Sequence, residues 1–274
     1  MNISRKLGMI LLAATLVLGL NVSGLNAAEV PAEVQDIVKR GTLRVGVKSD
    51  VPGFGIQALS GEYEGMEIDL SRKIAEAMGL SPDKVTFTAV TAKTRGQLLD
   101  SGDIDMVIAT FTITPDRKNT WNFSTPYYTD AVSLLVKKNS GIKTYSDLTD
   151  KLIGVAEGAT SKDALKASAA ANGVTLDDNA NFRTFPDYPS IKAALDAGQI
   201  NAFCVDGSIL TGYLDGATEI LSTIRFSPQD YGVATKLSNK GLATFVEGLI
   251  TTWLADGTID KLIADNGVTP SFKK

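Results

Sequence analysis

The stretch Asp105-Met-Val-Ile-Ala-Thr-Phe-Thr-Ile-Thr-Pro-Asp-Arg117 contains the transition from a strand to a helix. Residues 105–109 are apolar after the first position, which predicts a buried strand. Thr114 and Pro115 predict the start of a helix, with threonine as N-cap and proline at the first helical position. A strand, a polar loop and a helix start in this order are typical of α/β folds.

The same alternation of strands and helices continues on both sides of this stretch. Strands are predicted at 43–47, 85–90, 105–109, 131–136, 153–156, 182–185 and 202–205. Helices are predicted at 69–78, 95–101, 161–171, 190–197 and 208–213, and at 242–263 with an interruption near Gly257. Two similar sets of strands and helices predict two α/β lobes, each a mostly parallel sheet flanked by helices. In such sheets, ligands bind at the carboxyl ends of the strands and at helix N-termini.

The N-terminus has the pattern of a secretory signal peptide. Arg5 and Lys6 precede an apolar run from Leu7 to Leu20, and small residues end at Ala27-Ala28. This order predicts a signal peptide over residues 1–28, whereas a membrane-spanning helix needs about 20 apolar residues. An uncleaved signal anchor is the alternative reading. We expect a periplasmic protein without a lipid anchor, because no cysteine lies at the predicted cleavage site.

The composition excludes several classes of function. The chain has no histidine and one cysteine, Cys204, so His-based catalysis, His-ligated zinc and an intramolecular disulfide are unavailable. Without residues 1–28 it carries 25 basic and 31 acidic residues, a net charge of −6 that offers no broad footprint for nucleic acid. No glycine-rich nucleotide-binding motif is present. We therefore expect no cofactor, no metal and no nucleic-acid partner.

Several segments resemble one known family. Ala109-Thr-Phe-Thr-Ile-Thr-Pro-Asp-Arg117 and Trp121-Asn-Phe-Ser-Thr-Pro-Tyr-Tyr128 look like the hallmark segments of the polar amino-acid binding proteins of ABC importers. Further matches are Gly65-Met-Glu-Ile-Asp69, Gly154-Val-Ala-Glu-Gly-Ala-Thr-Ser161 and Gln229-Asp-Tyr-Gly232. The resemblance spans nearly the whole chain after residue 28.

The resemblance implies a two-lobed periplasmic binding protein fold whose lobes are joined by two crossover strands. The implied lobes are residues 29–131 together with 232–274, and residues 132–231. The lobes close by hinge motion on an amino acid, which a membrane ABC permease complex then receives. A monomer is expected. The resemblance implies a binding protein and not an enzyme.

Two residues at family positions are expected to bind the α-carboxylate that all amino acids share. Arg117 supplies a guanidinium able to make two parallel charge-assisted bonds. Thr160, with Ser161, lies where the second lobe's helix N-terminus meets the same carboxylate. The alternative readings are a solvated arginine and a plain N-cap.

Three other residues match the positions that bind the α-ammonium group. Asp206 matches the aspartate that pairs with this group, and Thr110 and Thr112 match positions that offer a carbonyl and a hydroxyl. A carboxylate is the natural partner of a buried ammonium. An N-cap role is the alternative for Asp206, since a helix is predicted to begin just after it.

Three residues are expected to bind the ligand's side chain. Lys48 replaces the acidic residue of glutamine binders, and Arg95 follows in the next loop. Their segments, and Phe185-Pro-Asp-Tyr-Pro-Ser-Ile-Lys192 with Tyr188, look especially close to the aspartate/glutamate-binding branch. Two cations fit a side-chain carboxylate, because buried unmatched cations are costly. Surface charges and a helix-start aromatic are the alternative readings.

Two alternatives for the function remain open. The ligand could be glutamine or another polar amino acid instead of aspartate or glutamate. A few relatives of this fold are dehydratases of arogenate-like or prephenate-like substrates. Here Asp206 or Glu247 would have to serve as the acid.

Overall fold

The computed structural model describes residues 30–269. The predicted signal peptide lies outside the described residues. Within them, no helix combines the length and the apolar character needed to cross a membrane.

The first of two larger sheets has five strands in the order β5-β1-β6-β14-β7. The strands are β1 (Leu43–Val47), β5 (Val85–Ala89), β6 (Met106–Ile108), β7 (Trp121–Phe123) and β14 (Ala234–Lys236). β1 lies parallel to both β5 and β6, whereas β14 runs antiparallel to β6 and β7. The sheet is therefore mostly parallel, and its antiparallel strand belongs to the segment of chain that returns late in the sequence.

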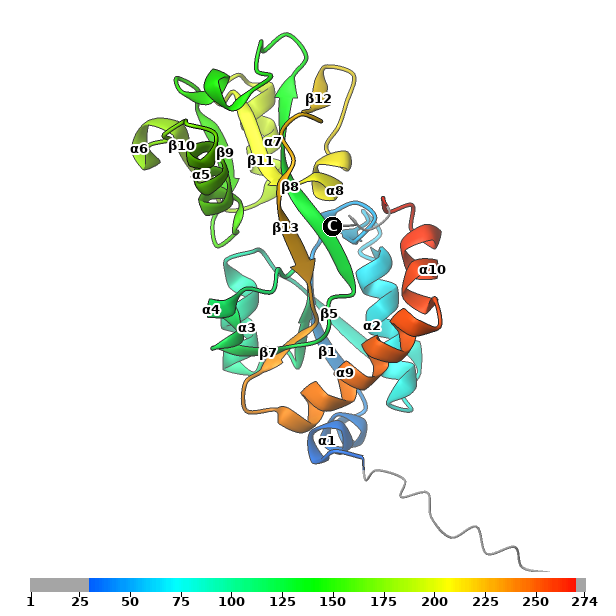
Figure 1. Ribbon diagram of the computed structural model, residues 1–274. Coiled ribbons are helices and arrows are strands. Elements are labelled where there is room, and N and C mark those ends of the chain that lie inside the picture. Colours follow the sequence, from blue (N-terminus) through cyan, green and yellow to red (C-terminus); the bar gives the residue numbers. More distant parts are fainter. Residues whose placement is uncertain (1–29, 270–274) are drawn as a thin grey trace, which may run out of the picture. The chain divides into compact units, whose positions relative to one another are not determined.

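Helices surround this sheet on both sides (Figure 1). They are α1 (Ala32–Arg40), α2 (Met66–Ala77), η1 (Pro82–Lys84), α3 (Thr94–Ser101), α4 (Pro115–Lys118), α9 (Lys240–Ala255) and α10 (Thr258–Asp265). α2, α9 and α10 pack against one another, and α3 packs against β1, β6 and β14. A small sheet of β2 (Asp50–Val51), β3 (Gly55–Gln57) and β4 (Tyr63–Glu64) follows β1.

The second large sheet has the order β10-β9-β11-β8-β12, with β13 also paired to β8. Its strands are β8 (Tyr128–Lys137), β9 (Ile153–Ala156), β10 (Phe182–Phe185), β11 (Ala202–Asp206), β12 (Thr218–Ile220) and β13 (Phe226–Tyr231). β9 lies parallel to β10 and β11, and β8 runs antiparallel to its neighbours. Its helices are η2 (Tyr145–Leu148), α5 (Ser161–Ala171), α6 (Asp178–Asn181), α7 (Tyr188–Asp196) and α8 (Gly207–Thr211).

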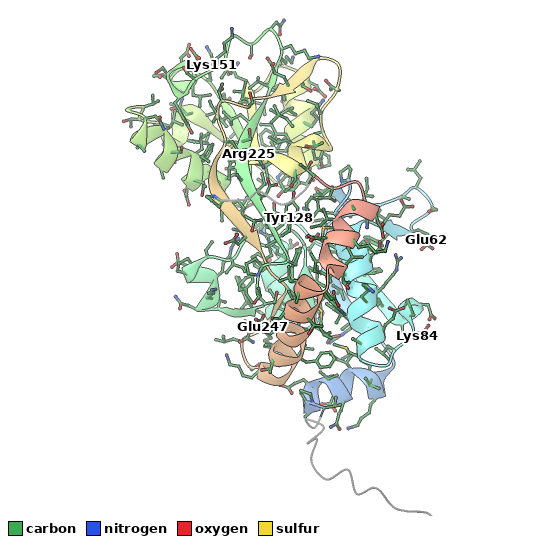
Figure 2. The ribbon with its side chains drawn as sticks, turned by 45° about the vertical axis from the view of Figure 1, so that its right-hand side comes forward. Glu62, Lys84, Tyr128, Lys151, Arg225 and Glu247 are labelled. Carbon is green, nitrogen blue, oxygen red and sulfur yellow. The ribbon has the colours of Figure 1, made fainter. Side chains whose placement is uncertain are left out.

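Two crossing strands connect the sheets. β8 carries the chain away from the first sheet, and β13 returns it to β14 (Figure 1). They pair antiparallel, with Tyr128 opposite Tyr231. Tyr128 on β8 and Arg225 just before β13 are labelled in Figure 2. The predicted two-lobed α/β fold with two crossover strands is confirmed.

Local signals in the sequence predicted the helix starts with mixed accuracy. Thr114 caps α4 as predicted, because its hydroxyl accepts a hydrogen bond from the Arg117 N–H at 3.2 Å. α2 begins at Met66, earlier than the predicted 69–78, because Gly65 enters the helix with φ +125°, a conformation open to glycine. Gly257, with φ +81°, separates α9 from α10 as predicted.

Candidate functional site

The predicted ligand residues gather where strands end. Lys48 follows β1 directly, Thr110 and Thr112 lie in the loop after β6, and Asp206 is the last residue of β11. These positions are the carboxyl ends of strands, where an open α/β sheet binds its ligands. All nine predicted residues are at least half-buried. Those classed as fully buried are Lys48, Arg95, Thr110, Thr112, Ser161, Tyr188 and Asp206.

Arg117 is held between the two lobes. Its Nη1 donates to the Thr112 carbonyl at 2.8 Å, and its Nη2 donates to the Gly158 carbonyl, on the second lobe, at 3.0 Å. Burial, and after it the nearby charge of Arg95, lowers the pKa of Arg117 to about 9. The guanidinium is therefore not a solvated surface group. A carboxylate beside it would be stabilised strongly by charge-assisted hydrogen bonds.

Arg117 and Arg95 share one aromatic neighbour. The guanidinium carbon of Arg117 lies 4.8 Å from the ring centroid of Phe111, and that of Arg95 lies 4.0 Å from it. Aromatic rings attract cations held at such distances. The loop between β6 and α4 therefore supplies the ring that both guanidinium groups face, and Arg117 follows in α4.

Asp206 stands at the N-cap position of α8, but its side chain binds Tyr231 and not a backbone N–H of the helix. Although it precedes α8, its side chain makes no capping bond, and it instead accepts a hydrogen bond from the Tyr231 hydroxyl. Burial raises the pKa of Asp206, and the nearby carboxylate of Asp130 raises it further. Arg95 and Arg117 act in the opposite direction, which places both cations near this carboxylate. The N-cap alternative for Asp206 is therefore wrong.

A second group of side chains lies around Lys48. Its Nζ is 4.5 Å from the ring centroid of Tyr188 and 3.0 Å from Oδ1 of Asp50. Only 1 % of Lys48 is exposed, and burial lowers its pKa. The reading of Lys48 as an ordinary surface charge is wrong. Sequence reasoning did not include Asp50, although it lies only two positions further along the chain.

Arg95 is equally removed from solvent. Its Nη1 donates to the carbonyls of Ala109 and Thr110 at 2.7 and 3.1 Å. Its Nε and the Thr110 hydroxyl are buried and have no hydrogen-bond partner among residues 30–269. Since buried polar atoms are normally paired, these two atoms mark a place where a ligand's acceptor would be stabilised.

Glu67, in the first turn of α2, is a further residue near the site that sequence reasoning did not include. Its side chain is fully buried. Its Oε1 accepts from the Thr110 N–H at 2.7 Å and from the Tyr127 hydroxyl at 2.6 Å. The signal was present in Gly65-Met-Glu-Ile-Asp69, where a glutamate occupies a position that turns toward the core.

The second lobe presents the N-terminus of α5. Thr160 does not cap this helix, because its hydroxyl donates to Oε1 of Gln229 on β13 at 2.7 Å. The Ser161 hydroxyl is buried without a partner in the described part of the chain. A helix N-terminus attracts negative charge. These features suit a carboxylate, and the plain N-cap reading of Thr160 is wrong.

The faces of the two lobes touch around these residues. Lys93 and Glu157 form an ion pair of 2.8 Å across them, and the Tyr213 hydroxyl donates to the Asp50 carbonyl. A Cβ added to Gly158 would lie 2.8 Å from the Ala92 carbonyl oxygen. The structure therefore shows the lobes in a closed arrangement.

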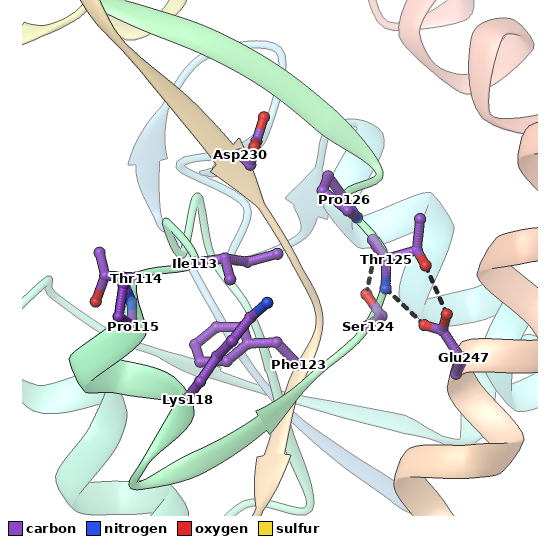
Figure 3. Close-up of a pocket in the computed structure, with 10 residues that line it drawn as sticks. All are labelled: Ile113, Thr114, Pro115, Lys118, Phe123, Ser124, Thr125, Pro126, Asp230 and Glu247. Carbon is purple, nitrogen blue, oxygen red and sulfur yellow. Dashed lines mark hydrogen bonds between the residues drawn. The ribbon is translucent and has the colours of Figure 1, made fainter.

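A separate pocket of about 590 Å³ contains none of the nine predicted residues (Figure 3). It lies beside α4, β13 and α9, and Glu247 lines it. The Glu247 carboxylate accepts hydrogen bonds from the backbone N–H and the hydroxyl of Thr125. Glu247 is thus engaged by Thr125, which argues against its use as the acid of a dehydratase. Among residues 30–269, no group of three or more acidic, Cys or His side chains could hold a metal ion.

Comparison with known proteins gives the family. Residues 43–267 match the family described as bacterial extracellular solute-binding proteins, family 3. The chain belongs to this family. The chain is therefore a solute-binding protein of the kind used in ABC import, and not an enzyme.

Curated relatives and solved structures agree with this assignment. The chain is 35% identical over 221 residues to an ABC transporter glutamine-binding protein from Bacillus subtilis strain 168, covering 79% of this chain and 78% of that protein. It is 32% identical over 267 residues to an L-cystine-binding protein from Escherichia coli K12, covering 95% and 94%. An ancestral arginine-binding protein bound to arginine superposes with a TM-score of 0.72 at 31% identity, covering 82% of this chain and 98% of that one. The family 3 protein described here therefore binds an amino acid.

Proposed function

We propose that this family 3 protein binds an acidic amino acid, aspartate or glutamate, and delivers it to a membrane ABC permease. The ligand names of its relatives differ, and the residues of this chain support an acidic ligand. The observation that carries the proposal is the buried guanidinium of Arg95, whose Nε has no partner in the described part of the chain. The hydroxyl of Thr110, the residue whose carbonyl accepts from this guanidinium, has none either. A side-chain carboxylate would accept hydrogen bonds from both and would compensate the charge.

The shared amino-acid group is bound at the other end of the site. Arg117 and the N-terminus of α5 receive the α-carboxylate, with Thr160 and Ser161 beside it. Asp206 pairs with the α-ammonium, and the loop residues Thr110 and Thr112 lie next to this pair. A closed cleft excludes water, which strengthens each of these charge pairs.

The ligand's side chain then extends toward Lys48, Arg95 and Tyr188. Lys48 is compensated by Asp50, so Arg95 contributes the larger share of the free positive charge. With an amide ligand this charge would remain without an anionic partner. Truncating one partner of a buried charge pair costs about 2–5 kcal/mol, which corresponds to at least about thirtyfold in Kd.

The proposal also includes location and assembly. The lobes comprise residues 29–131 with 232–274, and residues 132–231. The protein acts as a periplasmic monomer after loss of residues 1–28. Neither a cofactor nor a nucleic acid takes part.

Calorimetric titration of the mature protein with the twenty amino acids tests the ligand class. Aspartate and glutamate should bind at least about thirtyfold more tightly than asparagine and glutamine. Equal affinity for acids and amides would contradict the proposal. Aspartate and glutamate differ by one methylene, which changes the binding free energy by about 1–3 kcal/mol. The same titration resolves a difference of this size and therefore also separates aspartate from glutamate.

A second candidate is glutamine or another uncharged polar amino acid. The pair formed by Lys48 and Asp50 favours it, because it offers a donor and an acceptor, as a side-chain amide requires. The same titration decides between the candidates: glutamine would then bind more tightly than glutamate.

A further inference from the structure

Glu67 occupies a place that no ligand contact explains. It is the second residue of α2, its side chain is fully buried, and it faces the loop after β6. Both of its hydrogen bonds go to Oε1, whereas Oε2 has no partner among residues 30–269. An unpaired buried carboxylate oxygen is costly, so the position requires a functional reason.

The first consequence of Glu67 is geometric. Thr110 has φ +44°, a left-handed conformation that β-branched residues rarely adopt. The bond from its N–H to Glu67 fixes this residue, and its carbonyl accepts a hydrogen bond from Arg95. Glu67 therefore fixes the position of Thr110, whose carbonyl accepts the hydrogen bond from the Arg95 guanidinium. It thereby also orients the Thr110 hydroxyl.

The second consequence concerns charge. The charged groups that face Glu67 are Lys48, from the end of β1, and Arg95, from α3. The Tyr127 hydroxyl and the Thr110 N–H face it as neutral donors. Burial raises the pKa of Glu67 and outweighs Tyr127, the Thr110 N–H and the two cations, which lower it, so that the pKa is about 7. Near neutral pH the carboxyl group can therefore be charged or neutral, depending on what lies beside Arg95.

An acidic and an amide ligand differ in how they balance these charges. With an acidic ligand, Lys48, Arg95 and Arg117 and the ammonium group face Asp50, Asp206 and two ligand carboxylates. Four positive charges then meet four negative ones, and an ionised Glu67 would add a fifth negative charge. With an amide ligand there are only three negative charges, and an ionised Glu67 restores the balance.

We propose that Glu67 is a specificity-determining positioning residue, which takes up a proton when an acidic amino acid binds and stays ionised when an amide binds. This inference rests on the proposed binding of acidic ligands. It makes acid preference depend on pH. If a carboxyl group must be protonated in the complex, binding weakens once the pH exceeds the pKa of that group in the free protein. The affinity then falls by up to about tenfold per pH unit.

The test compares aspartate with asparagine, by calorimetry from about pH 6 to about pH 8 in two buffers of different ionisation enthalpy. The two ligands share the ammonium group, so proton exchange at Asp206 cancels in the difference. For the wild type, aspartate should take up close to one proton more than asparagine near the top of this range, and the preference for aspartate should fall as the pH rises. Glu67→Gln keeps an oxygen acceptor for Thr110 and Tyr127. In this variant the additional proton uptake with aspartate should vanish, and the preference for aspartate should no longer change with pH.

Two results would overturn the role of Glu67. One is a wild type that prefers aspartate but takes up no additional proton, and the other is an unchanged proton difference in Glu67→Gln. A wild type without any preference for acids overturns the proposed ligand class together with this inference, so the two failures can be told apart.

A second variant keeps the inference testable if Glu67→Gln does not fold. Tyr127→Phe removes one hydrogen bond that favours the ionised carboxylate. The decline in acid preference should then move to higher pH. A profile identical to that of the wild type would contradict the inference.

Discussion

Lys48 and Tyr188 are in contact although they come from different lobes. The Lys48 Nζ lies 4.5 Å from the Tyr188 ring centroid, with Lys48 at the end of β1 and Tyr188 at the start of α7 beside the second sheet. Burial lowers the pKa of Lys48 and raises that of Tyr188. Both groups are therefore shielded from water, and the proposed ligand side chain would lie where the two lobes meet.

The first prediction is that Arg117→Ala abolishes binding of every amino acid. All amino acids share the α-carboxylate, and loss of a buried charge partner costs about 3–5 kcal/mol. Calorimetry with the tightest ligand measures the loss. Lys118→Ala is the matched control, because Lys118 is the exposed neighbouring cation in α4 and should keep full affinity. An Arg117→Ala variant with wild-type affinity would exclude this residue from the site.

The second prediction concerns closure. Gly158→Ala places a Cβ 2.8–3.0 Å from backbone atoms of Ala92 and Lys93 in the other lobe, so the lobes cannot close fully. We expect at least about tenfold weaker ligand binding, or about 1.4 kcal/mol. Small-angle scattering should show less contraction with saturating ligand than in the wild type.

Gly173→Ala is the control for backbone strain. Gly158 and Gly173 both have φ +77°, so alanine should cost either position about 1 kcal/mol of stability or more. Chain neighbours aside, no heavy atom of residues 30–269 lies within 4 Å of a Cβ at Gly173, so that variant should lose stability but keep its affinity. Equal affinities in the two variants would show that Gly158 does not limit closure.

The third prediction is that binding of an uncharged amino acid such as asparagine weakens as the pH falls below neutral. Burial raises the pKa of Asp206 in the free protein, and the ligand's ammonium group favours the ionised form. Binding therefore releases a proton, and the affinity is greatest above the raised pKa and falls by up to about tenfold per pH unit below it. Calorimetry across the pH range measures this slope.

Two variants check the assignment to Asp206. Asp206→Asn should bind weakly, and its affinity for asparagine should fall less steeply with decreasing pH than that of the wild type, because only the contribution of Glu67 remains. Tyr231→Phe removes the hydrogen bond that favours the ionised carboxylate, so the loss of affinity should begin at higher pH. A wild type whose affinity for asparagine does not change with pH would contradict the pairing of Asp206 with the ammonium group.

Sequence reasoning succeeded where the signals are local or belong to a long family motif. The cap of α4 by Thr114 and the break at Gly257 depend on neighbouring residues only. The proximity of Arg117 to Asp206 was available from the resemblance, because Arg117 lies in a matched segment and Asp206 matches a single family position.

Partners that come from distant parts of the chain were not predicted. Asp206 was open to a capping role, and only the packing of β13 beside it brings the Tyr231 hydroxyl within reach. The burial of Glu67 likewise depends on Tyr127. Hydrogen bonds of this kind are set by tertiary packing, which no local pattern encodes.

The last prediction concerns acid against amide selectivity. Arg95→Gln keeps donors for the carbonyls of Ala109 and Thr110 but removes the charge that the proposed side-chain carboxylate needs. Aspartate and glutamate should therefore lose about 2–5 kcal/mol of binding free energy, whereas asparagine and glutamine should change little.

Lys48 must be altered together with its partner. Lys48→Met alone would leave the Asp50 carboxylate without its cation, so the matched change is Lys48→Met with Asp50→Asn, which removes one charge of each sign. Because net charge is preserved, this pair should reduce acid preference less than Arg95→Gln does. The measurement is the ratio of amide Kd to acid Kd in each variant, which is large when acids are preferred. If the paired change reduced this ratio more than Arg95→Gln, then Lys48 and not Arg95 would be the main partner of the side-chain carboxylate. A ratio that neither change affects would place both cations outside the ligand's reach and would favour a binder of uncharged polar amino acids.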